Sequence, residues 1–287
     1  MRILALIVLL VMPTLAREPL AERVAHTDPS TYHKIKSVHR GAGKLLYQGL
    51  LDSFDLSTNF LFLHRGVVPP KGGIGHHFHH KIEEMYVIFD NEAEFTINGR
   101  TSTLRGPAGA PCKMGQAHAI YNSSDKPTEW MNIAVSTGKG KYDNFDTNDD
   151  RVGAPQDKIP VFVTMRLERS LLRPVDRYYG GKGTVHYRRA LSPEVFTTNW
   201  AYVDHLVIPP GSSTGKRKHQ EVEEVYYVMN GSGAARVNDE SAAVRKGDAI
   251  PMRLGDEQSF ANDSSADLEL LIIGVSRVKG RLDPPGY

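Results

Sequence analysis

The chain has 287 residues, of which 40% are hydrophobic and 24% charged, and its formal net charge is +2. This length suits one large or two ordinary domains, and the composition is that of a soluble globular protein. The nearly balanced charge gives no indication of binding to nucleic acid or to an anionic membrane. Many glycines, prolines and short Val/Ile/Tyr runs favour strands and turns over long helices. We therefore expect an all-β protein.

The N-terminus has the pattern of a secretory signal peptide. Arg2 supplies a positive charge, Ile3 to Met12 form an apolar run, and Thr14 to Ala16 resemble a small-residue cleavage site. The run is shorter than the roughly 20 residues that a membrane-spanning helix needs. We expect residues 1–16 to be a removed signal peptide and the protein to be secreted or periplasmic, without membrane attachment after cleavage. A buried or lipid-exposed first helix is the alternative.

An internal repeat divides the chain. Shifted by 140 residues, the sequence matches itself without a gap from about Gly41 to Gly140. For example, KIEEMYVI aligns with EVEEVYYV, and PCKMGQAHAIYN aligns with PMRLGDEQSFAN. The chain is therefore two copies of one β domain. We place the first domain at 17–145, a linker at 146–160 and the second domain at 161–287, where PVFVTMRLERSLLRP is expected to form a strand and turn of the second domain or of the domain interface.

Each copy consists of strand-length runs separated by turn residues. In the first copy NFLFLHRGVV, EMYVIF and AEFTING are separated by PPKGG and DNE. Alternation along these runs makes one face of each strand apolar. Repeated short strands of this kind predict a closed barrel or jelly roll, in which few sheet edges are exposed. A sandwich is the alternative.

The segment GHHFHHKIEEMY concentrates histidine and glutamate. His77 and His79 are two residues apart, so both side chains lie on the same face of a strand and can bind one metal ion. Glu84 lies five residues past His79, which on an unbroken strand would turn it to the opposite face. Either the chain turns just before Glu83, or Glu83 is the ligand. A histidine-rich surface loop is the alternative to a metal site.

The same segment resembles the first motif of the cupin superfamily, which is Gly, His-x-His, three or four residues, Glu, six residues and Gly. The resemblance matches His77, His79 and Glu84 to this motif and places Asn91 where the closing glycine stands. From strand alternation alone we would favour Glu83 as the carboxylate ligand. The count of six residues favours Glu84.

The segment KMGQAHAIYN resembles the second cupin motif, Pro-x-Gly-x-x-His-x-x-x-Asn. Gly115, His118 and Asn122 match it, while Lys113 stands where the proline is usual and Pro111 lies two residues earlier. Because the resemblance covers both halves, the chain is similar to bicupins, which implies two tandem jelly-roll β-barrels. The metal ligands that the resemblance implies are His77, His79, Glu84 and His118.

The second copy has lost half of this set. It keeps one histidine and the glutamate, as His219 and Glu224, but carries Arg217 and Gln258 in place of the other two histidines. We predict that Arg217 pairs with Glu224 where a metal would otherwise lie. The second barrel would then be metal-free, with one metal ion per chain. The basic run around Arg217 is interpreted as a solvated rim, with a pocket for an anionic ligand as the alternative.

Imidazoles with one carboxylate suit several divalent ions. Fe(II) or Mn(II) is favoured here, and Zn, Ni or Cu is compatible with the same ligands. Four protein ligands leave two open positions on a six-coordinate ion, which permits a substrate or dioxygen to bind directly. A structural zinc would more often be closed and tetrahedral.

Further site residues follow from comparing the copies. Asn132 and His64 are polar where the second copy has Ile272 and Asp204, and Tyr86 shares the strand face of Glu84. We name Tyr86, Asn132 and His64 as candidate catalytic residues, although the repetition of Tyr86 as a tyrosine favours packing. The remaining expectations concern His76 and His80, which should face solvent, the lone Cys112, which should be buried and inert, and Trp130, which should lie in the core.

The resemblance leaves three functions open. The first is a mononuclear metal-dependent oxidoreductase or dioxygenase that acts on a small oxygen-bearing organic substrate, and this one is favoured. The second is a redox-neutral lyase, hydrolase or isomerase that acts on a sugar or small acid with the metal as Lewis acid. The third is a non-catalytic ligand-binding bicupin. The expected partner is a small molecule, and a homo-oligomer is compatible with the sequence.

Overall fold

The computed structural model describes residues 18–284, so the signal peptide predicted for residues 1–16 lies outside the described residues. Helical structure is restricted to α1 (Leu20–Arg23) and five single-turn 3-10 helices: η1 (Pro29–Thr31), η2 (Val38–Arg40), η3 (Arg169–Leu171), η4 (Tyr178–Gly180) and η5 (Pro193–Val195). Within this part of the chain no helix is long and apolar enough to cross a membrane. The expectation of an all-β protein is confirmed.

The first barrel contains two sheets. Their strands are β2 (His33–Lys36), β3 (Lys44–Leu51), β4 (Phe60–Val68), β5 (Gly73–Phe78), β6 (Ile82–Ile88), β7 (Glu92–Ile97), β8 (Arg100–Arg105), β9 (Ala108–Cys112), β10 (Ala117–Tyr121), β11 (Thr128–Ser136), β12 (Phe145–Asp149) and β13 (Met165–Arg166). The larger sheet has the order β13-β9-β6-β11-β4-β3-β2 and the smaller one the order β12-β5-β10-β7-β8.

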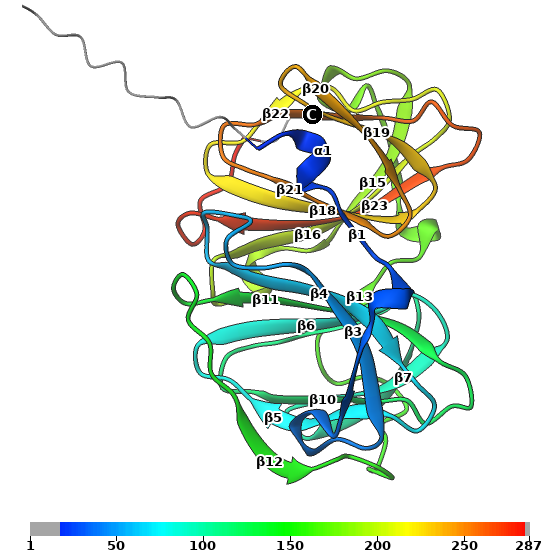
Figure 1. The fold of residues 1–287 in the computed structure, drawn as a ribbon, viewed down its shortest axis with the longest axis vertical. Helices are drawn as coiled ribbons and strands as arrows, with labels where there is room; N and C mark the ends of the chain where they lie inside the picture. Colours follow the sequence, from blue (N-terminus) through cyan, green and yellow to red (C-terminus); the bar gives the residue numbers. More distant parts are fainter. Residues whose placement is uncertain (1–17, 285–287) are drawn as a thin grey trace, which may run out of the picture.

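The second barrel repeats this arrangement. Its strands are β1 (Ala25–His26), β14 (Arg173–Asp176), β15 (Thr184–Leu191), β16 (Trp200–Ile208), β17 (Arg217–Lys218), β18 (Val222–Asn230), β19 (Ser232–Val237), β20 (Glu240–Arg245), β21 (Asp248–Met252), β22 (Glu257–Ala261) and β23 (Leu268–Ser276). The sheet orders are β1-β21-β18-β23-β16-β15-β14 and β17-β22-β19-β20. The two barrels lie one above the other along the long axis of the molecule (Figure 1).

The two seven-stranded sheets pack against each other, and this explains why their central strands are buried on both faces. On β6, Glu84 and Tyr86 point into the first barrel, whereas Met85 and Val87 belong to an apolar cluster shared with the second barrel. Residues from both barrels, including Trp200, fill this shared cluster. Strands between two buried layers read as nearly continuous apolar runs, so their faces are hard to assign from sequence.

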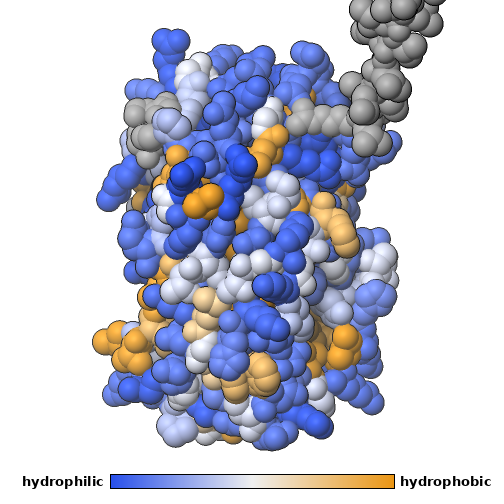
Figure 2. Space-filling view, turned by 90° about the vertical axis from the view of Figure 1, so that its left-hand side faces the viewer, coloured by the Kyte–Doolittle hydropathy of each residue, from blue (hydrophilic) through white to orange (hydrophobic). Residues whose placement is uncertain are grey.

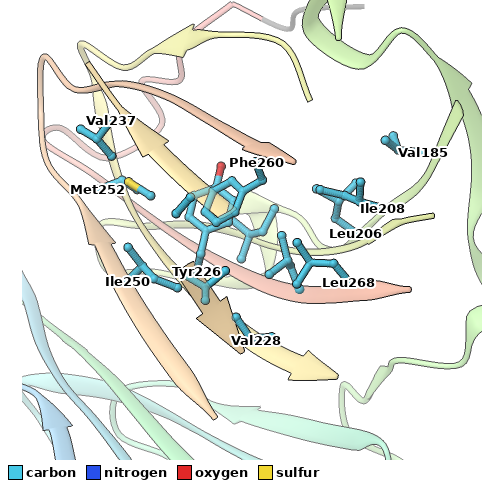
Figure 3. Close-up of a cluster of buried hydrophobic side chains, with 14 of the residues drawn as sticks. Val185, Leu206, Ile208, Tyr226, Val228, Val237, Ile250, Met252, Phe260 and Leu268 are labelled. Carbon is cyan, nitrogen blue, oxygen red and sulfur yellow. The ribbon is translucent and has the colours of Figure 1, made fainter. Parts of the chain in front are cut away.

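The interior of the second barrel is packed with its own side chains. Tyr226 and Phe260 stack with ring centroids 4.4 Å apart, and aliphatic residues such as Ile250 and Leu268 surround them (Figure 3). On the outside, hydrophobic side chains are scattered among hydrophilic ones on the face in Figure 2, without a continuous apolar band. This is the usual surface of a globular protein.

The structure corrects the predicted domain boundaries, because the barrels exchange short arms. Residues 18–26, which were assigned to the first domain (17–145), lie on the second barrel, where β1 pairs with β21 and Arg23 forms a buried ion pair with Asp256. Conversely β13, assigned to the second domain (161–287), pairs with β9 of the first barrel. Two-residue strands carry too short a pattern to reveal their partners from sequence.

The predicted linker at 146–160 is also wrong in its first part. Residues 146–149 belong to β12, which adds an edge strand to the first barrel through pairing with β5. Further along, Asp157 forms an ion pair with Arg100 of the same barrel. Phe145 stacks on Phe78 of β5, but the other residues of β12 are polar and mostly exposed, so no hydrophobic alternation marks this strand.

Candidate metal centre

Three neighbouring segments bring the four predicted ligands together. His77 lies on β5 directly opposite His118 on β10, His79 follows the end of β5, and Glu84 lies on β6. All four side chains are buried, and one potential ligand atom from each lies within 4.8 Å of the others. The structure thus assembles a His/His/Glu/His group that could hold a metal ion.

Hydrogen bonds set the orientation of two of the imidazoles. Nδ1 of His77 donates to the carbonyl oxygen of Gly75 at 2.7 Å, and Nδ1 of His79 donates to the carbonyl oxygen of Asp143. Both bonds leave the lone pair of Nε2 directed at the centre of the group, as is common for histidines that bind metals.

The polar atoms at the centre of this group do not satisfy one another's hydrogen-bonding capacity. Nε2 of His79 is buried without a hydrogen bond in the described part of the chain. Nε2 of His77 and Nε2 of His118 lie 3.1 Å apart, and Nε2 of His118 lies 3.6 Å from Glu84. Buried polar groups normally have partners. A cation between them would satisfy these lone pairs together, so the residues fit a divalent metal.

The pKa shifts of these residues are also consistent with a bound divalent metal ion. Burial lowers the pKa of His77 to about 2 and holds the pKa of His118 well below its ordinary value. Both imidazoles are therefore neutral and able to donate a lone pair at neutral pH. Burial also raises the pKa of Glu84, which His79 and Asn132 offset only in part. A bound cation would stabilise the Glu84 carboxylate.

The choice between the two glutamates follows from a turn. Residues 79–81 separate β5 from β6, and the two strands belong to different sheets. His79 and Glu84 are thus not on one unbroken strand, and Glu84 faces the histidines. Glu83 lies on the opposite face of β6, where its carboxylate accepts hydrogen bonds from Thr197 and Thr198 of the second barrel.

The three candidate catalytic residues surround the same cavity, of about 540 Å³, together with Glu84. Tyr86 stacks on His118 with ring centroids 4.6 Å apart. Asn132 donates from Nδ2 to Glu84 at 3.2 Å. His64 lies on the cavity wall, where burial lowers its pKa to about 4 and keeps it uncharged at neutral pH.

Sequence reasoning missed two residues at this centre. The ring of His39 stacks on that of His77 with centroids 3.7 Å apart, and Asp143 orients His79. Both lie outside the clear part of the repeat. For Asp143 a signal existed, since the 140-residue shift aligns it with Asp283. Asp283 likewise accepts from the backbone amides that follow His219, and it contacts His219 itself through its carboxylate rather than its carbonyl oxygen.

His76, His80, Cys112 and Trp130 are not among the four grouped residues. His80 is exposed, as expected, but His76 is half-buried and forms a 3.0 Å hydrogen bond with Thr147 on β12. Cys112 is buried, and burial raises its pKa well above the ordinary value, which makes the thiol inert. Trp130 is buried, with an exposed fraction of 2%.

The equivalent place in the second barrel holds an ion-pair network, as predicted. Arg217 donates to Glu224 and, from Nε, to Nε2 of His219 at 2.6 Å. Gln258 donates to the other oxygen of Glu224 at 2.7 Å, and Tyr202 donates to Glu224 at 2.6 Å. The guanidinium thus occupies the position that a metal ion would take.

Two stacked β-barrels, one with three histidines and a glutamate converging in its interior, define a bicupin by fold and by site. Sequence comparison agrees. The family model for the cupin domain matches residues 204–274, in the second barrel. The oxalate-binding protein of Thermotoga maritima is 33% identical over 94 residues, which are 33% of this chain and 78% of that protein. The chain belongs to the cupin superfamily.

Solved structures resemble the whole chain. The oxalate decarboxylase of Lactobacillus farciminis, in a formate complex, has a TM-score of 0.63 and 14% identity, covering 89% of this chain and 87% of that one. The oxalate decarboxylase of Bacillus subtilis at pH 4.6 has a TM-score of 0.60 and 15% identity, covering 88% and 76%. At these identities the likeness concerns the fold.

Proposed function

We propose that the chain is an exported metalloenzyme whose first barrel holds one divalent ion and acts on a small oxygen-bearing organic substrate. The observation that carries this proposal is the buried group of His77, His79, Glu84 and His118 next to a cavity. Fe(II) or Mn(II) is the favoured ion. The Mn(II) centres of Bacillus subtilis oxalate decarboxylase support manganese by analogy of fold.

The residues of the first barrel have distinct tasks in this proposal. His77, His79, Glu84 and His118 hold the ion, which when bound supplies a Lewis acid for an oxygen donor of the substrate and, if redox-active, an electron. Asn132 holds the Glu84 carboxylate in place. Tyr86 covers one face of His118 and thus keeps water from that side. His64 remains available on the wall as an uncharged hydrogen-bonding group.

For the reaction class, we favour oxidation with dioxygen as the oxidant. An apolar cavity beside a histidine-rich centre suits a substrate that is partly desolvated when it reacts. The second candidate is redox-neutral cleavage, such as decarboxylation of a small acid, and the fold neighbours that are oxalate decarboxylases favour it. Binding without turnover is the third, favoured by the relative described as an oxalate-binding protein.

The experiment begins with protein purified from the exported fraction and analysed for metal. A panel of small acids, sugars and phenols is then supplied under air and under nitrogen. Oxygen uptake that requires the metal supports oxidation, and product formation under nitrogen supports redox-neutral cleavage. Ligand binding without product in either atmosphere would indicate a binding protein. Absence of metal from the exported protein, together with failure to bind added Mn(II) or Fe(II), would refute the proposal as a whole.

A further inference from the structure

The cavity beside the metal centre is large and mostly apolar. Its volume is about 540 Å³, and its walls include Val38, Leu45, Leu61, Phe62, Ile74 and Trp130. Its charged lining residues other than Glu84 are Lys36 and Asp52, which are both exposed and opposite in sign. An ion as small and as highly charged as oxalate would leave most of this volume unfilled, and it would exchange hydration for apolar walls, which is unfavourable.

One polar group in this cavity has a defined hydrogen-bonding direction. Nδ1 of His39 lies 2.6 Å from Oδ1 of Asp146, and since a carboxylate only accepts, the imidazole donates its proton there. Nε2 of His39 then presents a lone pair and has no hydrogen-bond partner within residues 18–284. Because His39 also lines the cavity, this lone pair is an acceptor for a ligand.

The backbone holds this acceptor firmly. His39 has a φ of +49°, and its carbonyl oxygen packs so closely on Gly75 of β5 that a Cβ at Gly75 would lie 2.0 Å from it. Only glycine permits such an approach. The loop is therefore fixed on the strand that carries His77, with the ring of His39 stacked on the ring of His77 at an interplanar angle of 10°.

We infer that the first barrel takes a ligand with an apolar, ring-sized body and two adjacent oxygen atoms, at least one of them a hydroxyl that donates to Nε2 of His39. The inference rests on the proposed function, since the oxygen pair would lie at the Glu84 end of the cavity, and it specifies the substrate class. A dicarboxylate has no hydroxyl hydrogen at neutral pH to offer this acceptor.

In the second barrel the equivalent positions line a cavity of about 520 Å³ whose walls carry two arginines, Arg189 and Arg217. Tyr179 replaces His39 and accepts a 2.9 Å hydrogen bond from Arg217. Arg189 stands where the first barrel has Gly49, and its guanidinium lies 4.1 Å from the ring centroid of Tyr202, which replaces Phe62. In the second barrel these side chains are thus paired with one another. The first barrel has Gly49 and His39 at the positions of Arg189 and Tyr179, so among the described residues its cavity has no arginine in the wall and keeps an acceptor.

Calorimetric titration of the metal-loaded full chain under nitrogen tests the ligand class with three probes: oxalate, catechol and 2,3-dihydroxynaphthalene. We expect catechol to bind more tightly than oxalate, and the naphthalene diol about tenfold more tightly than catechol, because its second ring buries more apolar surface. Tightest binding of oxalate, equal binding of the two diols, or binding of none of the probes would overturn the inference. None of these titration results counts against the proposed function, which failure to bind metal or absence of turnover would contradict.

Two variants test the named residues. His39→Phe keeps a ring over His77 but removes the acceptor, so affinity for both diols should fall about tenfold while oxalate binding and metal content stay unchanged. Equal losses for oxalate and the diols, or loss of metal, would instead show that His39 only supports His77. Should His39→Phe not fold, His39→Gly serves, since glycine adopts positive φ readily and carries no side-chain acceptor. Gly49→Arg copies the second barrel and should exclude the naphthalene diol without lowering metal content. Unchanged diol binding in Gly49→Arg would contradict the placement of the ring.

Discussion

The carboxylate of Glu83 on the first barrel accepts hydrogen bonds from the backbone amide and the hydroxyl of Thr198 on the second, at 2.8 and 2.6 Å. Its repeat equivalent, Glu223, accepts from the amide of Thr58 at 2.7 Å and from the hydroxyl of Ser57 at 3.0 Å. Each barrel therefore contributes a buried carboxylate to a loop of the other. This reciprocity explains why a glutamate pair recurs in both copies: one carboxylate faces the barrel interior and the other the interface.

Replacement of Glu83 should weaken the interface and spare the metal. In Glu83→Gln the amide NH2 replaces one acceptor oxygen, so donors of Thr197 and Thr198 would lose their acceptor. We expect the free energy of unfolding to fall by about 2 kcal/mol. Chemical denaturation measures this loss, and metal analysis of the same sample should show normal content. Glu223→Gln is the matched control and should behave alike. A loss of metal in Glu83→Gln alone would contradict the assignment of Glu83 to the interface.

Much of the fold was accessible from the sequence because the repeat and the strand-length runs are explicit. The direction of Glu84 was not accessible from alternation, since the face of a strand depends on where the preceding strand ends and which sheet follows. Here β5 and β6 lie in different sheets, so counting by twos fails across residues 79–81. The motif resemblance favoured Glu84, which the structure places beside the three histidines, whereas local periodicity favoured Glu83.

Neither the repeat nor strand periodicity could reveal the arms that the barrels exchange, or the stacking of His39 on His77. The pairing of β1 with β21 joins residues more than 200 positions apart through only two register pairs, Ala25 with Ala249 and His26 with Asp248. Such a short strand has no periodicity to detect. His39 lies in a 3-10 turn that precedes the clear repeat, and only the close approach of its carbonyl to Gly75 places it over His77.

Replacement of His118 by glutamine, the residue at the equivalent position 258 of the second barrel, should remove the metal. His118→Gln exchanges a neutral imidazole for a weak amide ligand, and we expect metal content and activity to fall together. The reverse change, Gln258→His, is the control. It should not create a second site, because Arg217 already occupies that position. Elemental analysis should give one metal per chain for the unmodified protein and for Gln258→His. Two metals per chain in the unmodified protein would defeat the assignment of a single centre.

Asp143 should affect the metal although it does not contact the centre through its side chain. Its carboxylate accepts from the backbone amide of Lys81 at 3.0 Å, and its own carbonyl accepts from His79. In Asp143→Ala this loop loses its anchor and His79 its fixed orientation, so metal affinity should fall about 10- to 100-fold. Competition with a chelator of known affinity measures the change.

Asp283→Ala makes the equivalent change in the second barrel and provides the control for Asp143. It removes the partner of His219 but should leave metal affinity unchanged. If both variants weaken metal binding equally, the effect of Asp143→Ala reflects general destabilisation rather than the orientation of His79.

Loss of Arg217 should destabilise the second barrel strongly. Arg217→Ala would leave the fully buried Glu224 without its cation, and we expect the free energy of unfolding to fall by about 3 kcal/mol or more, with unchanged metal content. The double variant Arg217→Met with Glu224→Leu removes both charges and should recover most of this loss. If Arg217→Ala lost the metal, the second barrel would be part of the metal site after all.

The same ion pair predicts how stability depends on pH. Burial alone would raise the pKa of Glu224, but Arg217 and His219 outweigh it and hold this pKa well below the ordinary 4.5. Because the folded pKa is lower than the unfolded one, the stabilisation is complete above about pH 4.5 and is lost as the pH falls towards the folded pKa, by up to about 1.4 kcal/mol per pH unit. Burial alone would also raise the pKa of Asp283, but hydrogen bonds from His219 and from backbone amides lower it to about 2. Asp283 therefore adds to this loss of stability. His219 acts with the opposite sign, since Glu224 and Asp283 overcome burial and raise its pKa, so its contribution is present below about pH 6.5 and fades above it.

Calorimetric unfolding between about pH 6 and pH 3 should show falling stability in the unmodified protein, and a flatter profile in Glu224→Gln, which lacks the titrating carboxyl. Parallel profiles for the two proteins would show that Glu224 does not carry the acid sensitivity.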